Sequence, residues 1–217
     1  MVKLLNVSYY YRGENGVGGI TLEVAPGEFV LLTGKTGAGK TTLIKLISLE
    51  LFPVTGEISL ERFRSRDLKR RNLSRWRKRI GIVYQDFKLL RDRSILDNVR
   101  LAAYCETNLP GSSKTRALRA LANVGLSHKL HSRPDQLSTG EQQRAAIARA
   151  LVNEPFVLLA DEPVSNLDGE TASGIVELLQ RVNQAGTAML IATHQPERFD
   201  SCSPRVLRME RGRLAAT

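Results

Sequence analysis

The stretch of residues 34–42, Gly-Lys-Thr-Gly-Ala-Gly-Lys-Thr-Thr, constrains the fold of this chain more than any other part. It fits the pattern G-x-x-x-x-G-K-[ST], in which glycines leave room for backbone N–H groups to surround a polyphosphate. Residues 28–33 form a short apolar run that predicts a strand, and residues 41–51 have the apolar spacing of a helix. The motif needs this order of strand, loop and helix, so the flanks favour a phosphate-binding loop over a flexible glycine turn.

The residue types in this loop indicate roles. Lys40 would reach the β- and γ-phosphates of a nucleotide, and the Thr41 hydroxyl would bind Mg²⁺. The dipole of the helix that begins here also favours an anion. We therefore expect a site for ATP and Mg²⁺, with nucleotide contacts along the whole loop: Gly34, Lys35, Thr36, Gly37, Ala38, Gly39, Lys40, Thr41 and Thr42.

Composition narrows the class of protein. The 217 residues suit a single domain, and 42% hydrophobic and 25% charged residues are ordinary for a soluble globular protein. No apolar run approaches the roughly 18 residues of a membrane span, and the first residues do not resemble a signal peptide. Two cysteines provide neither a disulfide framework nor metal-ligand spacing. We expect a protein of the reducing cytoplasm.

The net charge of +10 is concentrated in residues 62–79, where Asp67 is the only acid. Its cations are Arg62, Arg64, Arg66, Lys69, Arg70, Arg71, Arg75, Arg77, Lys78 and Arg79. Only Phe63 and Trp76 could stack on bases, so no nucleic-acid partner is expected. Two interpretations stay open for this stretch: a solvated basic face, or a surface held against anionic lipid.

Apolar periodicity predicts an α/β fold of the P-loop NTPase type. Strands are predicted at residues 2–10, 20–24, 57–60, 80–84, 156–160 and 188–192, and helices at 94–104, 112–124, 139–152 and 170–183. Continuous apolar strands that alternate with helices favour a mainly parallel core sheet. The early strands predict an antiparallel β subdomain, and residues 86–152 predict an α-helical subdomain inserted in one domain of residues 1–217.

Two acids follow the apolar strand at residues 156–160. Catalytic groups gather at the carboxyl ends of strands in open α/β sheets. Asp161 is predicted to position Mg²⁺, and Glu162 to polarise an attacking water. Together with the phosphate loop, these acids indicate a nucleotide hydrolase. Nothing in the sequence suggests a site for the substrate hydroxyl that a kinase needs.

Residues 137–144, Leu-Ser-Thr-Gly-Glu-Gln-Gln-Arg, provide a second anion-binding turn at the start of a helix. One domain already has its own phosphate loop. A second site is useful where Ser138, Gly140 and Glu141 cap the nucleotide that another copy of the chain holds.

With these motifs in this order, residues 2–214 resemble the ABC transporter ATPases, whose signature motif reads Leu-Ser-Gly-Gly-Gln or Leu-Ser-Gly-Gly-Glu. The resemblance implies that Gln85 contacts Mg²⁺ and water, that Asp168 lies in a loop crossing a dimer interface, and that His194 contacts the γ-phosphate. The family also places an aromatic on adenine, which implies Tyr11, with Tyr9 and Tyr10 as alternatives. The implied catalytic residues are thus Glu162, His194 and Gln85, and the implied metal ligands are Thr41, Gln85 and Asp161.

Thr139 departs from the family pattern, because it replaces the first glycine of the signature pair. Its Cβ lies where backbone is expected to approach phosphate. We therefore expect a low but real ATPase rate, slow without a partner.

Residues 84–94, with Gln-Asp-Phe-Lys-Leu-Leu followed by Asp-Arg, are similar to the FtsE family of cell-division ATP-binding proteins. This resemblance implies an FtsX-like membrane partner that docks near Gln85, Phe87, Leu89 and Leu90, and a homodimer that closes on ATP. Closure would regulate peptidoglycan hydrolysis from the cytoplasmic face of the inner membrane at the division septum. The alternative for these apolar residues is packing within the helical insert.

Other functions stay open at this point: the ATPase of a lipoprotein or macrolide exporter, a soluble ABC ATPase acting on nucleic acid, and an ATP-gated scaffold at the division site. Without nucleotide the chain is expected to be a monomer.

Overall fold

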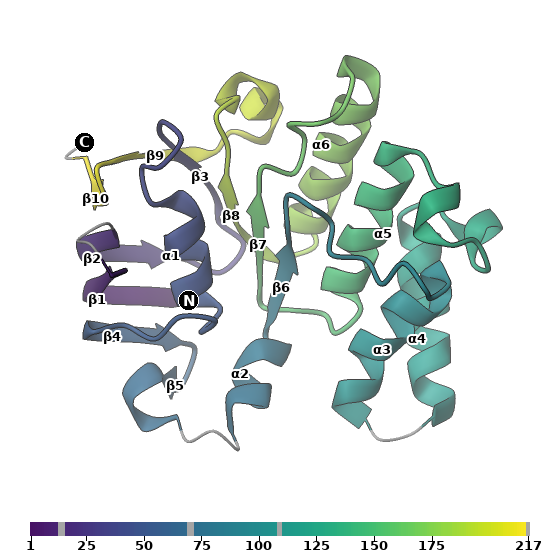
Figure 1. Ribbon diagram of the computed structural model, residues 1–217, viewed down its shortest axis with the longest axis horizontal. Helices are drawn as coiled ribbons and strands as arrows, with labels where there is room; N and C mark the ends of the chain where they lie inside the picture. The colour runs from purple at the N-terminus through teal and green to yellow at the C-terminus, as the bar shows by residue number, and fades with distance from the viewer. Residues whose placement is uncertain (13–15, 69–71, 108–109, 216–217) are drawn as a thin grey trace.

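A six-stranded sheet forms the centre of the molecule in the computed structural model, which describes residues 1–12, 16–68, 72–107 and 110–215. Its strand order is β10-β9-β3-β8-β7-β6. These strands are β3 (Phe29–Thr33), β6 (Ile80–Val83), β7 (Val157–Asp161), β8 (Ala188–Ala192), β9 (Arg205–Glu210) and β10 (Arg213–Leu214). Every neighbouring pair is parallel except β9 with β10. The predicted mainly parallel core is confirmed (Figure 1).

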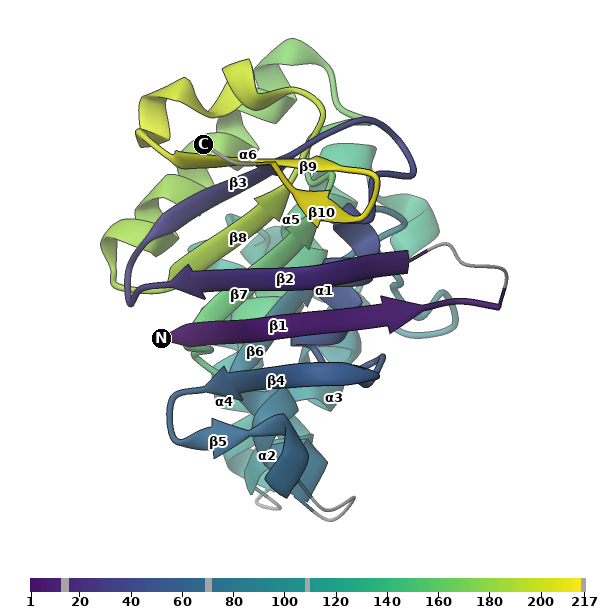
Figure 2. The same cartoon turned by 90° about the vertical axis from the view of Figure 1, so that its left-hand side faces the viewer.

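A second, antiparallel sheet has the order β2-β1-β4-β5. It is built from β1 (Val2–Tyr10), β2 (Gly16–Val24), β4 (Thr55–Leu60) and β5 (Phe63–Arg64). Turned by 90°, this sheet faces the viewer, with helix α1 (Lys40–Ile47) and the larger sheet behind it (Figure 2). The predicted antiparallel β subdomain is therefore present, but β3 leaves it and pairs with β8 and β9.

Helices cover the opposite face of the central sheet (Figure 1). They are α3 (Ile95–Thr107), α4 (Pro110–Asn123), α5 (Thr139–Leu151) and α6 (Gly169–Gln184). Alternate residues of one strand enter different cores, because side chains alternate across a sheet. Leu32 packs with α1 and the small sheet, whereas Leu31 packs with the layer of α3–α6. The limits 86–152 of a helical subdomain stay a prediction.

The first helix ends at Ile47, four residues before the predicted end. Leu49 takes a left-handed backbone, with φ 53°, and stops the helix. Trp76 Nε1 and Arg77 Nη2 then donate to the Ile47 and Leu49 carbonyls, both at 2.9 Å. Such bonds contribute about 0.5–1.5 kcal/mol each. Both donors come from α2 (Leu73–Lys78), a short helix in the basic stretch that was not predicted.

Three further strands were not predicted: β5, β9 and β10. Lys69, Arg70 and Arg71 of the basic stretch lie outside the described residues. Within the part of the chain that is described, no helix combines the length and apolarity of a membrane span.

Candidate active site

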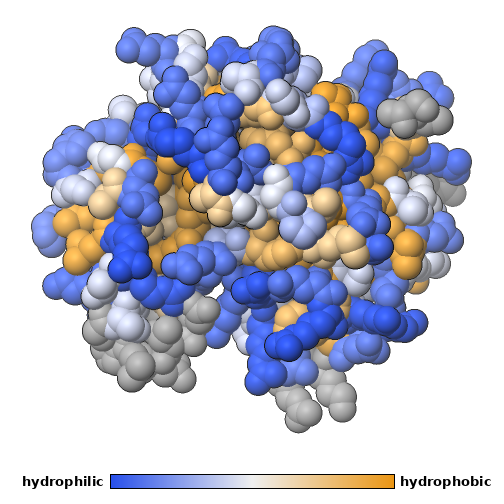
Figure 3. Space-filling model, turned by 180° about the vertical axis from the view of Figure 1, so that it is seen from behind, coloured by the Kyte–Doolittle hydropathy of each residue, from blue (hydrophilic) through white to orange (hydrophobic). Residues whose placement is uncertain are grey.

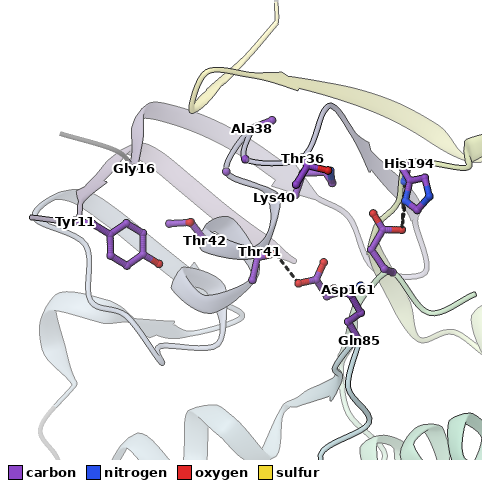
Figure 4. A pocket seen from close by; sticks show the side chains of 13 residues that line it. Tyr11, Gly16, Thr36, Ala38, Lys40, Thr41, Thr42, Gln85, Asp161 and His194 are labelled. Atoms are coloured by element: carbon purple, nitrogen blue, oxygen red, sulfur yellow. Dashed lines mark hydrogen bonds and ion pairs between the residues drawn. The ribbon is translucent and has the colours of Figure 1, made fainter. Parts of the chain in front are cut away.

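The loop after β3 opens a pocket of about 600 Å³ at the carboxyl ends of the central strands (Figure 4). Its walls come from six separate stretches of the chain, which bring most of the predicted site residues together. They are Tyr11, Gly16, Thr36, Gly37, Ala38, Gly39, Lys40, Thr41, Thr42, Gln85, Asp161, Glu162 and His194. The volume lies within the range of small-molecule sites.

Two glycines of the phosphate loop are required by close neighbours within the chain. A Cβ on Gly34, with φ 146°, would lie 2.3 Å from the Met209 carbonyl oxygen of β9. A Cβ on Gly39, with φ 104°, would lie 2.8 Å from side-chain carbons of Met209 and Val17. Only at Gly37 is there no atom within 4 Å of the Cβ position. The loop is therefore shaped by its neighbours, and Gly37 borders the open pocket.

Lys40 is held by the loop itself. Its ammonium is buried, with 8% of the residue exposed, and donates to the Gly34 carbonyl at 2.7 Å and the Lys35 carbonyl at 3.4 Å. Gly39, the N-cap of α1, has no side chain to accept from the first N–H groups of the helix. A buried cation beside uncapped N–H groups suits an anion. Gly34 and Lys35 do not line the pocket; they contribute carbonyls that hold Lys40.

Two predicted metal ligands meet directly. Thr41 Oγ1 donates to Asp161 Oδ2 at 2.7 Å, and Gln85 lines the same pocket nearby (Figure 4). Burial raises the pKa of Asp161, which the bond from Thr41 opposes. A hydroxyl, a carboxylate and an amide are the oxygen ligands that Mg²⁺ accepts. No cluster of three or more His, Cys, Asp or Glu side chains fit for a metal occurs among the described residues.

Glu162 and His194 also meet. His194 Nδ1 lies 2.8 Å from Glu162 Oε2, and the His194 backbone N–H donates to the same oxygen at 3.3 Å. Glu162 has a left-handed backbone, with φ 50°, which costs a non-glycine residue about 1–2 kcal/mol. Its N–H donates to the Ala192 carbonyl of β8 at 2.9 Å, which holds that conformation. The Glu162 carboxylate is thus aimed at the pocket beside Asp161.

Tyr11 is the tyrosine that lines this pocket, and 40% of it is exposed. Tyr9 supports it edge to face, with ring centroids 5.0 Å apart. Tyr10 points into two other cavities. Gly16, at the start of β2, lines the pocket and was not predicted. The glycine-rich turn before Ile20 was the available signal, but residues 13–15 lie outside the described part.

Besides Gly34 and Lys35, four predicted nucleotide ligands lie outside the pocket, at the starts of α5 and α6, and have partners within the chain. Ser138 is the N-cap of α5, and its Oγ accepts from the Glu141 N–H at 3.3 Å while Glu141 Oε2 accepts from the Ser138 N–H at 2.9 Å. Asp168 caps α6 by accepting from the Thr171 N–H at 2.9 Å and hydroxyl at 2.8 Å. A Cβ on Gly140 would lie 2.3 Å from Thr171 Cγ2, so this glycine is required for packing of α5 on α6. Thr139 is exposed.

The predicted docking residues differ in their surroundings. Leu89 packs against the core under α3–α6, as the packing interpretation expects. Leu90 is 47% exposed, and Phe87 is half-buried. Gln85 is exposed beside the pocket. Leu90 is therefore the apolar side chain of this segment that a partner could reach.

Comparison with known proteins identifies the family that this chain resembles. A family model described as ABC transporter matches residues 17–165. The cell division ATP-binding protein FtsE of Mycobacterium tuberculosis is 40% identical over 99% of this chain and 94% of its own length. FtsE of Escherichia coli K12 is 40% identical over 99% of this chain and 97% of its own length. FtsE of Bacillus subtilis is 40% identical over 94% of this chain and 89% of its own.

Solved structures agree in fold. The dimeric ATP-binding cassette MJ0796, in a post-hydrolysis state bound to ADP and Pi, has a TM-score of 0.90 and 32% identity, covering 100% of this chain and 97% of that one. CbiO1 from Clostridium perfringens, part of an ABC transporter complex, has a TM-score of 0.88 and 30% identity, covering 99% and 86%.

Proposed function

We propose, from the premise that this chain belongs to the ABC transporter family and within it to the cell division ATP-binding proteins FtsE, that it binds and hydrolyses ATP as the ATP-binding subunit of an FtsEX-like complex. One observation carries the proposal. The phosphate loop, the Thr41–Asp161 pair and the Glu162–His194 pair line a single pocket. This constellation suits hydrolysis of a nucleoside triphosphate.

Each residue has a role in the proposal. Lys40 and the uncapped N–H groups of α1 bind phosphate, and Tyr11 stacks on the base. Thr41, Asp161 and Gln85 supply oxygens to Mg²⁺, which neutralises phosphate charge when bound. Glu162 orients the attacking water. His194 bonds to the Glu162 carboxylate in the chain without nucleotide, and it contacts the γ-phosphate once nucleotide is bound.

Two copies complete two sites. Ser138, Gly140, Glu141 and Asp168 lie outside the chain's own pocket, so we infer that they act on the nucleotide of a second copy. ATP then joins the two chains into a homodimer, and the chain without nucleotide is a monomer. The likeness to a dimeric cassette bound to ADP and Pi supports this inference.

The membrane partner is an FtsX-like protein that docks at the segment of Gln85, Phe87, Leu89 and Leu90. Closure of the dimer is transmitted through this segment and regulates peptidoglycan hydrolysis during cell division. The chain acts at the cytoplasmic face of the inner membrane, at the septum. The exposure of Leu90 and the identity to FtsE proteins support this placement.

A basic edge adds affinity for anionic lipid. In the view from behind, hydrophilic residues gather along the lower edge of the molecule, where β5 and α2 lie (Figure 3). Arg62, Arg64 and Arg75 are exposed there, whereas Arg79 donates to both oxygens of Glu61 at 2.8 Å. We expect salt-sensitive binding to vesicles that contain anionic lipid, and equal binding to neutral vesicles would contradict this part of the proposal.

The deciding experiment is a pull-down from native membranes with the Glu162→Gln chain and ATP as bait. The proposal expects one membrane protein with few spans and an extracytoplasmic domain, together with septal hydrolases. An exporter permease with lipoprotein or drug substrates would instead assign the chain to the exporter alternative. The same pull-down without ATP is the control, because it shows which proteins the undimerised chain recovers.

A docking variant sharpens this pull-down. Leu90→Asp should lose the membrane protein, because it charges the exposed apolar side chain of the segment. Val206→Asp is the matched control, since Val206 of β9 is similarly exposed at 46% and lies elsewhere. Loss of recovery with both variants would point to misfolding.

A further inference from the structure

The turn after β6 has an unusual backbone. Phe87 and Lys88 are consecutive non-glycine residues in the left-handed region, with φ 57° and 47°. Their N–H groups are paired inside the turn, to the Tyr84 carbonyl at 3.1 Å and the Asp86 carbonyl at 2.6 Å. Left-handed conformations disfavour residues with a Cβ, so a pair of them persists only where the surroundings impose it.

Arg149 imposes it from another element. This residue belongs to the last turn of α5, and its Nη2 donates to the Phe87 carbonyl at 2.5 Å while its Nη1 donates to the Lys88 carbonyl. The planar fork of a guanidinium matches two successive carbonyls in a way that a single ammonium cannot. Burial lowers the pKa of Arg149, an effect that the neighbouring Tyr84 and Asp86 oppose.

Helix α5 connects the contact of Arg149 to Ser138, which the proposed function assigns to the nucleotide of a second copy. Its N-cap is Ser138, which is eleven residues before Arg149 and therefore about 16 Å away along the helix axis. Ala145, Ala146, Ile147 and Ala148 are fully buried, so the helix is packed along its length. A packed helix moves as one body, and displacement at one end displaces the other.

The docking segment is the stretch from Gln85 to Leu90. Its last residue, Leu90, is bonded to a different helix. Asn98 of α3 accepts from the Leu90 N–H at 2.7 Å and donates to the Leu90 carbonyl at 3.1 Å. The segment is thus held at Leu90 by α3 and at residues 87–88 by α5. The second attachment joins the segment by hydrogen bonds to α5 itself, the helix that begins at Ser138.

We propose that Arg149 is a positioning residue that ties the turn at residues 84–88 to α5, so that engagement of Ser138 by a second copy moves the turn to which the membrane subunit binds. The inference rests on the proposed function for the dimer and the docking. It adds the residue through which the two are coupled.

The first test uses hydrogen exchange on the chain alone. In the Glu162→Gln background, ATP should change the exchange of the amides at residues 86–90 as the dimer forms. Adding Arg149→Ala should abolish that change, and Arg149→Lys should restore part of it. Arg116→Ala is the matched control, because Arg116 of α4 donates to the Val152 carbonyl at 2.9 Å and Asn153 Oδ1 at 3.1 Å, at the same end of α5.

Size-exclusion chromatography reports the dimer separately. If the Glu162→Gln chain forms no dimer with ATP, the proposed function fails. If Arg149→Ala forms the dimer and its turn responds to ATP as before, the inference is overturned while the proposed function stands. An equal loss in Arg116→Ala also overturns it, since any weakening of the helical layer would then suffice.

The second test uses the complex with its membrane subunit in lipid nanodiscs. Arg149→Ala should reduce the increase in turnover that the membrane subunit causes by about fivefold or more, the usual scale of coupling between sites. The effect is expressed as the ratio of turnover with the membrane subunit to turnover of the isolated chain, because Gln85 of the pocket lies in the same turn and the isolated chain can lose activity through it. A proportional loss of turnover in the isolated chain would assign Arg149 a merely structural role and overturn the inference.

Discussion

The nucleotide pocket and the signature turn, which comprises residues 138–141 at the start of α5, differ in how their polar groups are prepared for a ligand. In the pocket, burial raises the pKa of Asp161, and Lys40 is buried among carbonyls beside open space. At the signature turn, the Ser138 N–H lowers the pKa of Glu141, and the carboxylate of Glu141 and the hydroxyl of Ser138 each accept from the other residue's backbone N–H in a capping box. The pocket concentrates unfavourable electrostatics that a ligand relieves, whereas the signature turn is already satisfied.

This difference separates two steps. A single chain has a pocket shaped for nucleotide, so binding needs no second copy. The signature turn of a single chain gains little free energy from binding an anion, because its N-cap bonds are already made. In the proposed dimer, the free energy of pairing would therefore come from the nucleotide bound between the two chains, which would make the dimer responsive to ATP.

The largest expected effect comes from the pocket. Glu162→Gln should lower turnover about 10²–10⁴-fold, because the amide cannot take a proton from water. Steady-state phosphate release measures the loss, and size-exclusion chromatography should show an ATP-dependent dimer. Glu170→Gln, the same change in the first turn of α6, is the control. A comparable loss in that control would remove Glu162 from its assigned role.

Mixing two inactive chains tests whether the halves belong to different copies. Lys40→Ala should destroy the pocket and Ser138→Arg the signature turn. Each variant alone should be inactive, while random pairing in a mixture should restore about a quarter of wild-type turnover, since each mixed dimer holds one intact composite site. Phosphate release from the titrated mixture is the measurement. A mixture as inactive as its components would place both halves in one chain's site.

A smaller effect is expected at Thr139. This exposed residue has the extra Cβ that the family pattern lacks, so Thr139→Gly should raise ATP-dependent dimerisation and turnover several-fold. Sedimentation and phosphate release measure the two quantities. Thr139→Ser, which removes the methyl group and keeps the Cβ, should remain close to wild type. If glycine changes neither quantity, Thr139 does not limit closure.

The smallest effect concerns stability and pH. The folded pKa of Glu141 is below its ordinary value, so its contribution is present above the unfolded pKa and is lost as pH falls through the folded pKa. Glu141→Ala should therefore lower Tm at neutral pH by about 1–3 °C, and the difference should vanish in acid. Thermal melts across pH test this. Glu177→Ala, an exposed glutamate inside α6, should show no such pH dependence.

Local patterns were sufficient for the central elements of the fold. The strand, loop and helix around Lys40 and the acids after β7 follow from short stretches of sequence, and the structure brings them together. The end of α1 could not be predicted in this way, because Trp76 and Arg77 reach it from far along the chain. Strand β9 lacks regular apolar alternation, and its place between β3 and β10 is set by pairing with residues far along the chain.

The site shows the same division. Motifs predicted which residues line the pocket, but not which groups hold them in the nucleotide-free chain. The carbonyls that bind Lys40 and the histidine on Glu162 depend on backbone geometry that residue types do not specify. The position of Gly16 at the pocket depends on its pairing with Tyr10 between strands β1 and β2. The resting partners of Ser138 and Asp168 likewise arise from helix caps.

The contact between Gly34 and Met209 orders events during synthesis of the chain. The phosphate loop is shaped against β9, and the Gly212 N–H donates to the Ala38 carbonyl at 3.0 Å. A ribosome makes the loop early and these supports last. The growing chain therefore cannot finish its nucleotide pocket until residue 212 has left the exit tunnel. A chain that stops before residue 209 lacks both of these supports of the loop.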